Sequence, residues 1–580
     1  MKKTAIFILL IMTFMSCTDI LDLTPKNSLS DADFWTNEAA IQGYVDYAYH
    51  MLNEYTATNV KDGRMMSWGH FRAEACDEAH PHILWGGGLE ITDNKLNPSS
   101  ASSIGSWYDN YQIIQHINIF FDYYEKGRFN VPEAKLKLWM AEMHFIRAYC
   151  YNQMIKAYDG VIITKKPFTS DDPVDQVRAS YDECVAFILE EINESLKGLP
   201  TVEALAGRLS IGAALGLKAQ VLLHAASPLH NPSNDKAKWT AAAAAAKAVI
   251  DLPQYSLYKP ADYRNVFFHT KSKGNTEIIL SKHARAMSGE LINMFNFPST
   301  LFGPPSFGGW GLATPIQQLV DDFQMADGTP YDRTKHGAAP YQNRELRFYA
   351  SILYDGAEYS KTMPRVPETT KLNPDGSLVG YKVESGTYKY KDATGAIKTR
   401  NGYDRLGGVL QETKNYTRTG YYCHKYVRDD VTTKFNVGEP VQMVMMRLTE
   451  FYLMYAECLV NLDRGAEARD YLLPIRRRVG LPDASLPAVI TMKEVMQERR
   501  TELCFEGQRF FDVRRWKILE PTFKDVYGVN VANDQTVTPA TATYTYFKVQ
   551  TRTYNEKLYY MPIPQTEINK NPLLEQNPGY

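Results

Sequence analysis

The chain has 580 residues, of which 44% are hydrophobic and 22% are charged, and its formal net charge is -2 at pH 7. This is the composition of a globular protein, and the length exceeds what one hydrophobic core usually serves, so we expect several cores or one composite body with a large insertion. The near-neutral charge provides no broad attraction to polyanions, so we expect no nucleic-acid partner.

The first residues have the pattern of a bacterial export signal. Two lysines precede an apolar run over residues 5–15, which is too short for a permanent membrane-spanning helix of about 20 residues. The run ends in Phe14-Met15-Ser16-Cys17, which resembles a bacterial lipobox. We therefore predict a lipoprotein signal peptide over residues 1–16 and lipidation of Cys17, with an ordinary secretory signal as the alternative. Acyl chains on Cys17 would make residues 17–30 a tether between a membrane and the globular body.

The pattern is helical from residue 31 to residue 253. The clearest apolar stripe lies between Pro173 and Pro200, where apolar residues recur every three or four positions and must bury against another helix. Further helices are predicted over residues 31–52, 105–125, 133–157, 208–226 and 236–250. We expect residues 31–253 to form an N-terminal helical scaffold.

The composition of the sequence changes after Pro253. Residues 254–440 are rich in Gly, Pro, Tyr and Thr, and short alternating runs over 381–390 and 396–400 predict a hairpin. This segment is predicted to be a loop-rich insert. Helical patterns return over 441–462, 466–479 and 492–505. The segment 441–580 would then complete a scaffold of stacked helix pairs, in which each pair buries the face of its neighbour.

The sequence shows no recognisable catalytic or metal-binding motif. It lacks a phosphate-binding loop, a GxSxG elbow and an HExxH helix. Cys76-Asp77-Glu78-Ala79-His80-Pro81-His82 resembles a metal site only superficially, because the proline prevents the two histidines from sharing a helical face. The acidic residues at 171, 172 and 175 lack the spacing of an EF-hand loop. We predict no metal, no cofactor and no enzymatic activity.

The remaining cysteines form no CxxC pair and have no regular spacing. Export would permit disulfides. However, Cys150, Cys184 and Cys458 lie on helix-like apolar faces, where a free cysteine packs as a small hydrophobic side chain. We therefore predict that most of these cysteines are buried thiols.

Several short motifs occur in a specific order. They are Leu21-Asp22, Phe34-Trp35, Arg147-Ala148-Tyr149, Asp327-Gly328, Arg447-Leu448-Thr449-Glu450, Glu498-Arg499-Arg500, Arg515-Trp516 and Gln576-Asn577-Pro578-Gly579-Tyr580. Together with Cys17 they resemble the SusD/RagB family of Bacteroidetes surface lipoproteins over essentially the whole chain. One motif departs from the family, which commonly has Asn-Arg-Asp-Pro-Arg where this chain has Asn343-Arg344-Glu345-Leu346-Arg347.

The resemblance implies both a fold and a function. The fold would be mainly α and SusD-like, with about four tetratricopeptide-like helix pairs that support a loop-rich irregular subdomain with short β-hairpins. The function would be to capture oligosaccharides at the outer membrane, facing the extracellular surface, and to deliver them to a SusC-like TonB-dependent transporter. A RagB-type peptide-binding lipoprotein is the alternative, and a surface hydrolase is disfavoured because the catalytic residues are missing.

A sugar site needs exposed aromatic faces with polar side chains beside them. Trp68, Asp77 and Trp85 lie in a stretch that ends in three glycines, and Trp310 lies in a glycine-rich loop. The family builds its ligand site from the loop after the first helix and from the central insert, so we predict these four as ligand-binding residues. The structural alternatives are packed tryptophans and a helix-capping Asp77.

Other residues are predicted to be structural. Trp107 and Trp139 lie on helical patterns and are expected in the core, and Trp516 matches a scaffold motif of the family. Residues 498–512 alternate in charge at helical spacings, which favours ion pairs between helices.

Overall fold

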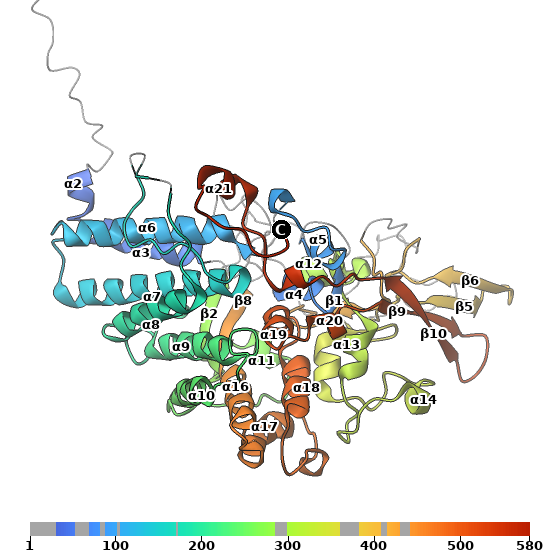
Figure 1. Cartoon of the computed structure of the whole chain (residues 1–580). Coiled ribbons are helices and arrows are strands. Elements are labelled where there is room, and N and C mark those ends of the chain that lie inside the picture. The colour runs from blue at the N-terminus through green and yellow to red at the C-terminus, as the bar shows by residue number, and fades with distance from the viewer. Residues whose placement is uncertain are drawn as a thin grey trace, which may run out of the picture.

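The computed structural model describes residues 31–52, 69–81, 87–100, 105–169, 172–173, 175–284, 298–359, 382–407, 415–429 and 441–580. Long helices form one half of the protein, whereas short helices, loops and small sheets form the other half (Figure 1). The protein is mainly α, which confirms the predicted fold class.

The scaffold contains four pairs of neighbouring helices: α3 with α6, α7 with α8, α9 with α10, and α16 with α17. Each pair also contacts the next pair, so the pairs form a continuous stack (Figure 1). This half of the protein contains the eight paired helices and also α2 and α18. Its helices are α2 (Asp31–Phe34), α3 (Glu38–Met51), α6 (Trp107–Glu125), α7 (Glu133–Tyr158), α8 (Tyr181–Leu196), α9 (Ile211–Ala226), α10 (Lys236–Ile250), α16 (Leu448–Asn461), α17 (Gly465–Arg478) and α18 (Met492–Leu503). Sequence segments from both halves of the chain therefore build one scaffold.

Local sequence explains where these helices begin. Ser180 caps α8 in a capping box with Glu183, and Thr491 does the same for α18 with Glu494. Each box satisfies backbone N–H groups that the first turn leaves without a partner. Most of the apolar stripe predicted between Pro173 and Pro200 is buried on α8, although Val177, which precedes the helix, is exposed. Burying each large apolar side chain contributes about 1.5–3 kcal/mol.

A two-stranded antiparallel sheet lies between the N-terminal and C-terminal helices of the scaffold (Figure 1). It pairs β2 (Ile278–Ala284) with β8 (Val441–Arg447). The prediction of a helix from Val441 was therefore wrong for its first seven residues. The run is apolar on both faces and buried from 442 to 447, and periodicity alone cannot distinguish such a strand from a buried helix.

The other half of the protein is built from short elements. They are α4 (Gly69–Glu74), β1 (Ala79–Pro81), α5 (Gly88–Thr92), α11 (Asn265–Phe268), α12 (Pro298–Phe302), β3 (Ala313–Pro315), α13 (Gln317–Asp322), α14 (Arg333–His336), α15 (Leu346–Ser351), β4 (Ile352–Leu353), β7 (Tyr422–Cys423), α19 (Arg509–Arg515), α20 (Leu519–Thr522) and α21 (Gln565–Lys570).

A four-stranded sheet projects from this half (Figure 1). Its order is β10 (Thr541–Gln550), β9 (Val526–Asp534), β5 (Thr387–Lys391) and β6 (Ile397–Asn401). The hairpin β5–β6 confirms the predicted one. The hairpin β9–β10 was not predicted, although the alternation of Thr with Tyr in β10 is a strand signal.

Most of the apolar side chains share one large core, and a smaller core lies among α16, α17 and α18. Trp107, Trp139 and Trp516 are buried, as predicted. The six cysteines of the described residues are free and buried, which confirms the predicted thiols.

Ion pairs buried around α18 connect it to other elements. Glu502 accepts hydrogen bonds from Arg347 at 3.3 Å and Arg447 at 2.9 Å, and it pairs with Arg478. Burial alone would raise the pKa of Glu502, but these three guanidinium groups outweigh it and hold the pKa below its ordinary value. The predicted ion pairs between helices are confirmed here and between Arg499 of α18 and Asp512 of α19, 2.6 Å apart.

Candidate ligand-binding site

Two segments that are far apart in the sequence meet in the antiparallel pair β1–β3. His80 lies opposite Thr314 and Pro81 lies opposite Ala313. The Thr314 hydroxyl also donates to the His80 carbonyl at 3.1 Å. In an antiparallel pair, the chain leaving one strand lies beside the chain entering the other. Pro81, at the end of β1, therefore lies beside the start of β3, which directly follows the loop that contains Trp310.

The loop that contains Trp310 is folded tightly against α12. The backbone N–H groups of Trp310, Gly311 and Leu312 donate to carbonyls of residues 300, 303 and 301 at 2.7, 3.1 and 2.9 Å. A Cβ atom on Gly309 would collide with the Gly303 carbonyl, so only glycine allows this close approach. The backbone hydrogen bonds hold Trp310 in a defined position.

The Trp310 side chain is partly buried and packs against the large core. It thus lies at the surface of the loop-rich half without being fully exposed. Trp68, Trp85 and Cys17 fall outside the described residues, so their predicted roles remain predictions. Trp85 belongs to residues 82–86, which connect Pro81 to Gly87.

Asp77 belongs to the scaffold, which corrects the expectation that it contacts ligand. Its side chain is buried, and its two carboxylate oxygens accept from Arg509 at 2.8 Å each. Arg500 pairs with the same carboxylate at 2.8 Å. Burial would raise the pKa of Asp77, but Arg500 and Arg509 outweigh it and lower the pKa below its ordinary value. These bonds attach Asp77, two residues before β1, to α18 and α19.

Neighbouring carboxyl groups are buried as well. Burial raises the pKa of Glu78 to about 7, although Arg500 opposes the shift. Burial also raises the pKa of Glu74. Neither side chain is more than 1% exposed, whereas a glycosidase needs two carboxyl groups that flank an open cleft. Over the described part of the chain, no cluster of three or more His, Cys, Asp or Glu is arranged to hold a metal ion.

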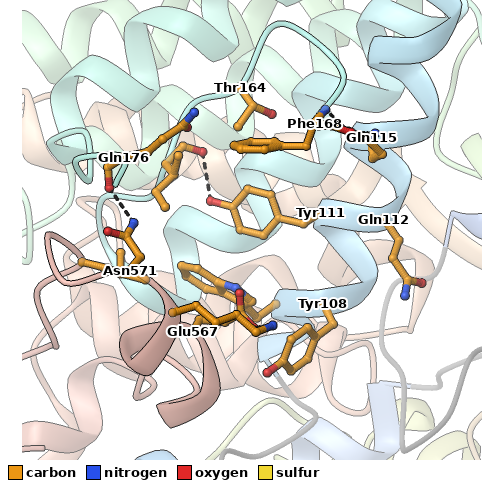
Figure 2. Close-up of a pocket in the computed structure, with 13 residues that line it drawn as sticks. Tyr108, Tyr111, Gln112, Gln115, Thr164, Phe168, Gln176, Glu567 and Asn571 are labelled. Atoms are coloured by element: carbon orange, nitrogen blue, oxygen red, sulfur yellow. Dashed lines mark hydrogen bonds and ion pairs between the residues drawn. The ribbon is translucent and has the colours of Figure 1, made fainter. Parts of the chain in front are cut away.

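A separate pocket of about 470 Å³ lies on the scaffold between α6 and α21 (Figure 2). Its aromatic residues are Trp107, Tyr108, Tyr111 and Phe168. Its polar residues are Gln112, Gln115, Thr164, Gln176, Glu567, Lys570 and Asn571. No pattern in the sequence predicts this pocket, because its walls come from three segments that are far apart in the chain.

Stacked helix pairs that support a loop-rich second half define a helical-repeat protein. The profile of the SusD family matches residues 276–580, and a profile described as starch-binding associating with outer membrane matches residues 21–223. The chain belongs to the SusD family, which confirms the resemblance found in the sequence. In the described residues, no helix has the length and apolar character needed to span a membrane.

Known relatives support this assignment. A SusD-like protein of Formosa agariphila is 24% identical over 524 residues, which cover 86% of this chain and 88% of the relative. The crystal structure of a SusD-like protein from Bacteroides fragilis is 27% identical and superposes with a TM-score of 0.73, covering 95% of this chain and 99% of that one. A structure named as a laminarin-binding SusD-like protein is 19% identical, with a TM-score of 0.62 and coverage of 94% and 100%.

Proposed function

We propose that this protein is a non-catalytic glycan-binding lipoprotein of the cell surface, which captures oligosaccharides and delivers them to a SusC-like TonB-dependent outer-membrane transporter. A lipid on Cys17 would attach it to the outer membrane. The ligand would lie across Trp310 and Trp85, on the loop-rich half of the protein. Polar groups of the surrounding loops would bond to the sugar hydroxyls.

The β1–β3 pair is the observation that carries this proposal. Pro81 lies opposite Ala313, and the four residues from Pro81 to Trp85 reach at most about 14 Å. Trp310 lies three residues before Ala313. The strand that precedes residues 82–86 is thus paired with the strand that follows Trp310, which supports the proposal that Trp85 and Trp310 belong to one site.

The chemistry of the predicted residues favours a sugar. An indole ring offers a flat apolar face that stacks on the C–H face of a pyranose, whereas a site for extended peptides would use strand addition along a backbone. The names of two solved relatives agree with this choice: one is a laminarin-binding protein and the other a surface glycan-binding protein of Bacteroides fluxus.

A binding screen of the full chain in mild detergent tests the proposal. Affinity gels would contain starch, laminarin, xylan or galactomannan, and calorimetry would follow with matching oligosaccharides. We expect retardation by at least one polymer, and we expect Trp310→Ala and Trp85→Ala each to weaken binding roughly tenfold or more through loss of stacking. Tyr124→Ala, which removes an exposed ring of α6, is the control and should bind normally.

The same screen includes a peptide digest and an assay for released reducing ends. Binding of peptides without binding of any polysaccharide would favour the RagB-type alternative, and release of sugar ends would indicate a hydrolase. Retardation that neither tryptophan substitution changes would contradict the proposed position of the site.

A further inference from the structure

The pocket between α6 and α21 has rigid walls. The Gln115 amide binds the backbone of Phe168 twice, by donating to its carbonyl at 3.0 Å and accepting from its N–H at 2.8 Å. The Tyr111 hydroxyl donates to the Ile162 carbonyl at 2.9 Å, and Asn571 donates to the Gln176 carbonyl at 2.7 Å. These bonds attach Ile162 and Phe168 to α6, and Gln176 to the residue that follows α21. A pocket formed in advance loses little conformational entropy when a ligand binds.

Exposed rings line this pocket. Tyr108 is 47% exposed and Phe168 is 40% exposed, and their rings lie on opposite sides of the Tyr111 ring (Figure 2). Most of the protein's other exposed apolar side chains lie on separate elements, and isolated ones need no explanation. Here two of them share one concave site, so their exposure points to a ligand.

The polar side chains of the pocket indicate the chemical class of the ligand that it would bind. Gln112 and Gln176 supply amide groups, each able to donate to and accept from a hydroxyl group. The two charged residues, Glu567 and Lys570, pair with each other at 2.9 Å, so the rim carries no net charge. Flat rings beside amide groups suit a sugar, and the absence of net charge from this rim favours a neutral one.

We propose that this pocket is a second carbohydrate site, which binds a neutral hexopyranose unit and shares no lining residue with the loop of Trp310. A volume of about 470 Å³ suits one or two sugar rings. This inference uses the chemistry of the pocket and does not depend on the position proposed for the first site. If one glycan chain occupies both sites, the second contact is intramolecular and raises the avidity for polymers above that for short oligosaccharides.

Calorimetry of the full chain in mild detergent would test this proposal. The probes are the hexasaccharides of the laminarin, starch, cellulose and mannan series. For the wild type we expect two bound oligosaccharides per chain. Phe168→Ala and Tyr108→Ala should each weaken one of the two binding events by about fivefold to tenfold. Tyr124→Ala removes an exposed ring of the same helix outside the pocket and should leave both events unchanged.

A pair of variants separates stacking from a structural role of Tyr108. Its hydroxyl bonds to Thr566 at the start of α21, so Tyr108→Ala removes both the ring and this bond. Tyr108→Phe removes the bond alone and should keep the affinity of the second event. Thermal unfolding of each variant verifies that it is folded. Loss of binding in Tyr108→Phe equal to that in Tyr108→Ala would overturn the role of the ring.

The binding results of the variants distinguish failure of the first proposed site from failure of the second. If Trp310→Ala removes all binding and the pocket variants change nothing, the second site is refuted and the first stands. If Trp310→Ala changes nothing and Phe168→Ala removes binding, the first position is refuted and the pocket stands. If Phe168→Ala leaves sugar binding intact but weakens recovery of the transporter with this protein, the pocket is a protein contact and the proposal is wrong. Absence of binding by every probe would refute both.

Discussion

Replacing Asp77 with alanine should destabilise the fold, because Asp77 connects the start of β1 to the C-terminal scaffold. The substitution removes the bidentate partner of Arg509, whose two bonds to this carboxylate are each 2.8 Å long. It also removes one partner of Arg500, which keeps its pair with Asp322 and its bond to the backbone carbonyl of residue 77. Both guanidinium groups are buried.

Breaking a buried ion pair by removing one partner costs about 3–5 kcal/mol. We expect a value toward the lower end, because only Arg509 loses its carboxylate partner completely. The stabilisation has a definite pH dependence. Arg500 and Arg509 lower the pKa of Asp77 in the folded protein, so its contribution is complete above the pKa of the unfolded chain, about 3.9, and is lost as the pH falls through the folded value.

Urea unfolding at pH 7, followed by tryptophan fluorescence, would measure this loss. Glu190→Ala is the control, since the Glu190 carboxylate pairs with the exposed Lys165 at 3.3 Å, and exposed pairs contribute about 0–1 kcal/mol. An Asp77→Ala protein with wild-type stability and lost glycan binding would refute our assignment and restore Asp77 to the ligand site.

Two further predictions concern the site loop and a buried acid. Gly309→Ala places a Cβ against the Gly303 carbonyl, so it should distort the loop and weaken glycan binding. The control is Gly43→Ala in α3, whose Cβ meets no atom within 4 Å and which should stabilise the fold by up to about 1 kcal/mol. Equal glycan binding by both variants would contradict the role of the loop. Burial raises the pKa of Glu450 to about 7, so the fold disfavours its ionised form and wild-type stability should decrease as the pH rises from about 4.5 to about 7. Glu450→Gln keeps an acceptor for Gln220 and should be more stable than the wild type at pH 8, by at most about 3 kcal/mol. This difference in stability, measured by urea unfolding, should vanish near pH 5. A difference that does not depend on pH would contradict the prediction.

The sequence was most informative where one physical signal dominates. The stripe that became α8 has an apolar face of helical period and a capping box at Ser180, and the two signals agree. The run from Val441 to Arg447 has no polar face, so its partner β2 decides its conformation. That partner lies more than 150 residues earlier, and local periodicity cannot reveal it.

The ligand site was less predictable than the scaffold. The glycine-rich loop predicts that Trp310 has little core to join, and its side chain packs only partly into the core. The sequence predicts Asp77 as a ligand residue because it lies between Trp68 and Trp85 in a stretch that ends in three glycines, but its arginine partners come from residues 500 and 509. The pocket between α6 and α21 has walls from residues 107–115, 162–176 and 567–574. The sequence of each wall segment is typical of an ordinary helix or loop, so only the tertiary structure reveals that these segments bring their aromatic rings together.

Buried ion pairs and strand pairing connect the charged residues of α18 and α19 to the proposed site in three steps. Arg500 and Arg509 hold Asp77 at the start of β1, β1 pairs with β3, and β3 directly follows the loop of Trp310. The charge pattern over 498–512 thus holds the start of β1 and, through β3, helps to position the loop of Trp310, where we propose that the ligand binds. Specificity for a particular glycan would accordingly be set by loop side chains, while the position of the site is set by the scaffold.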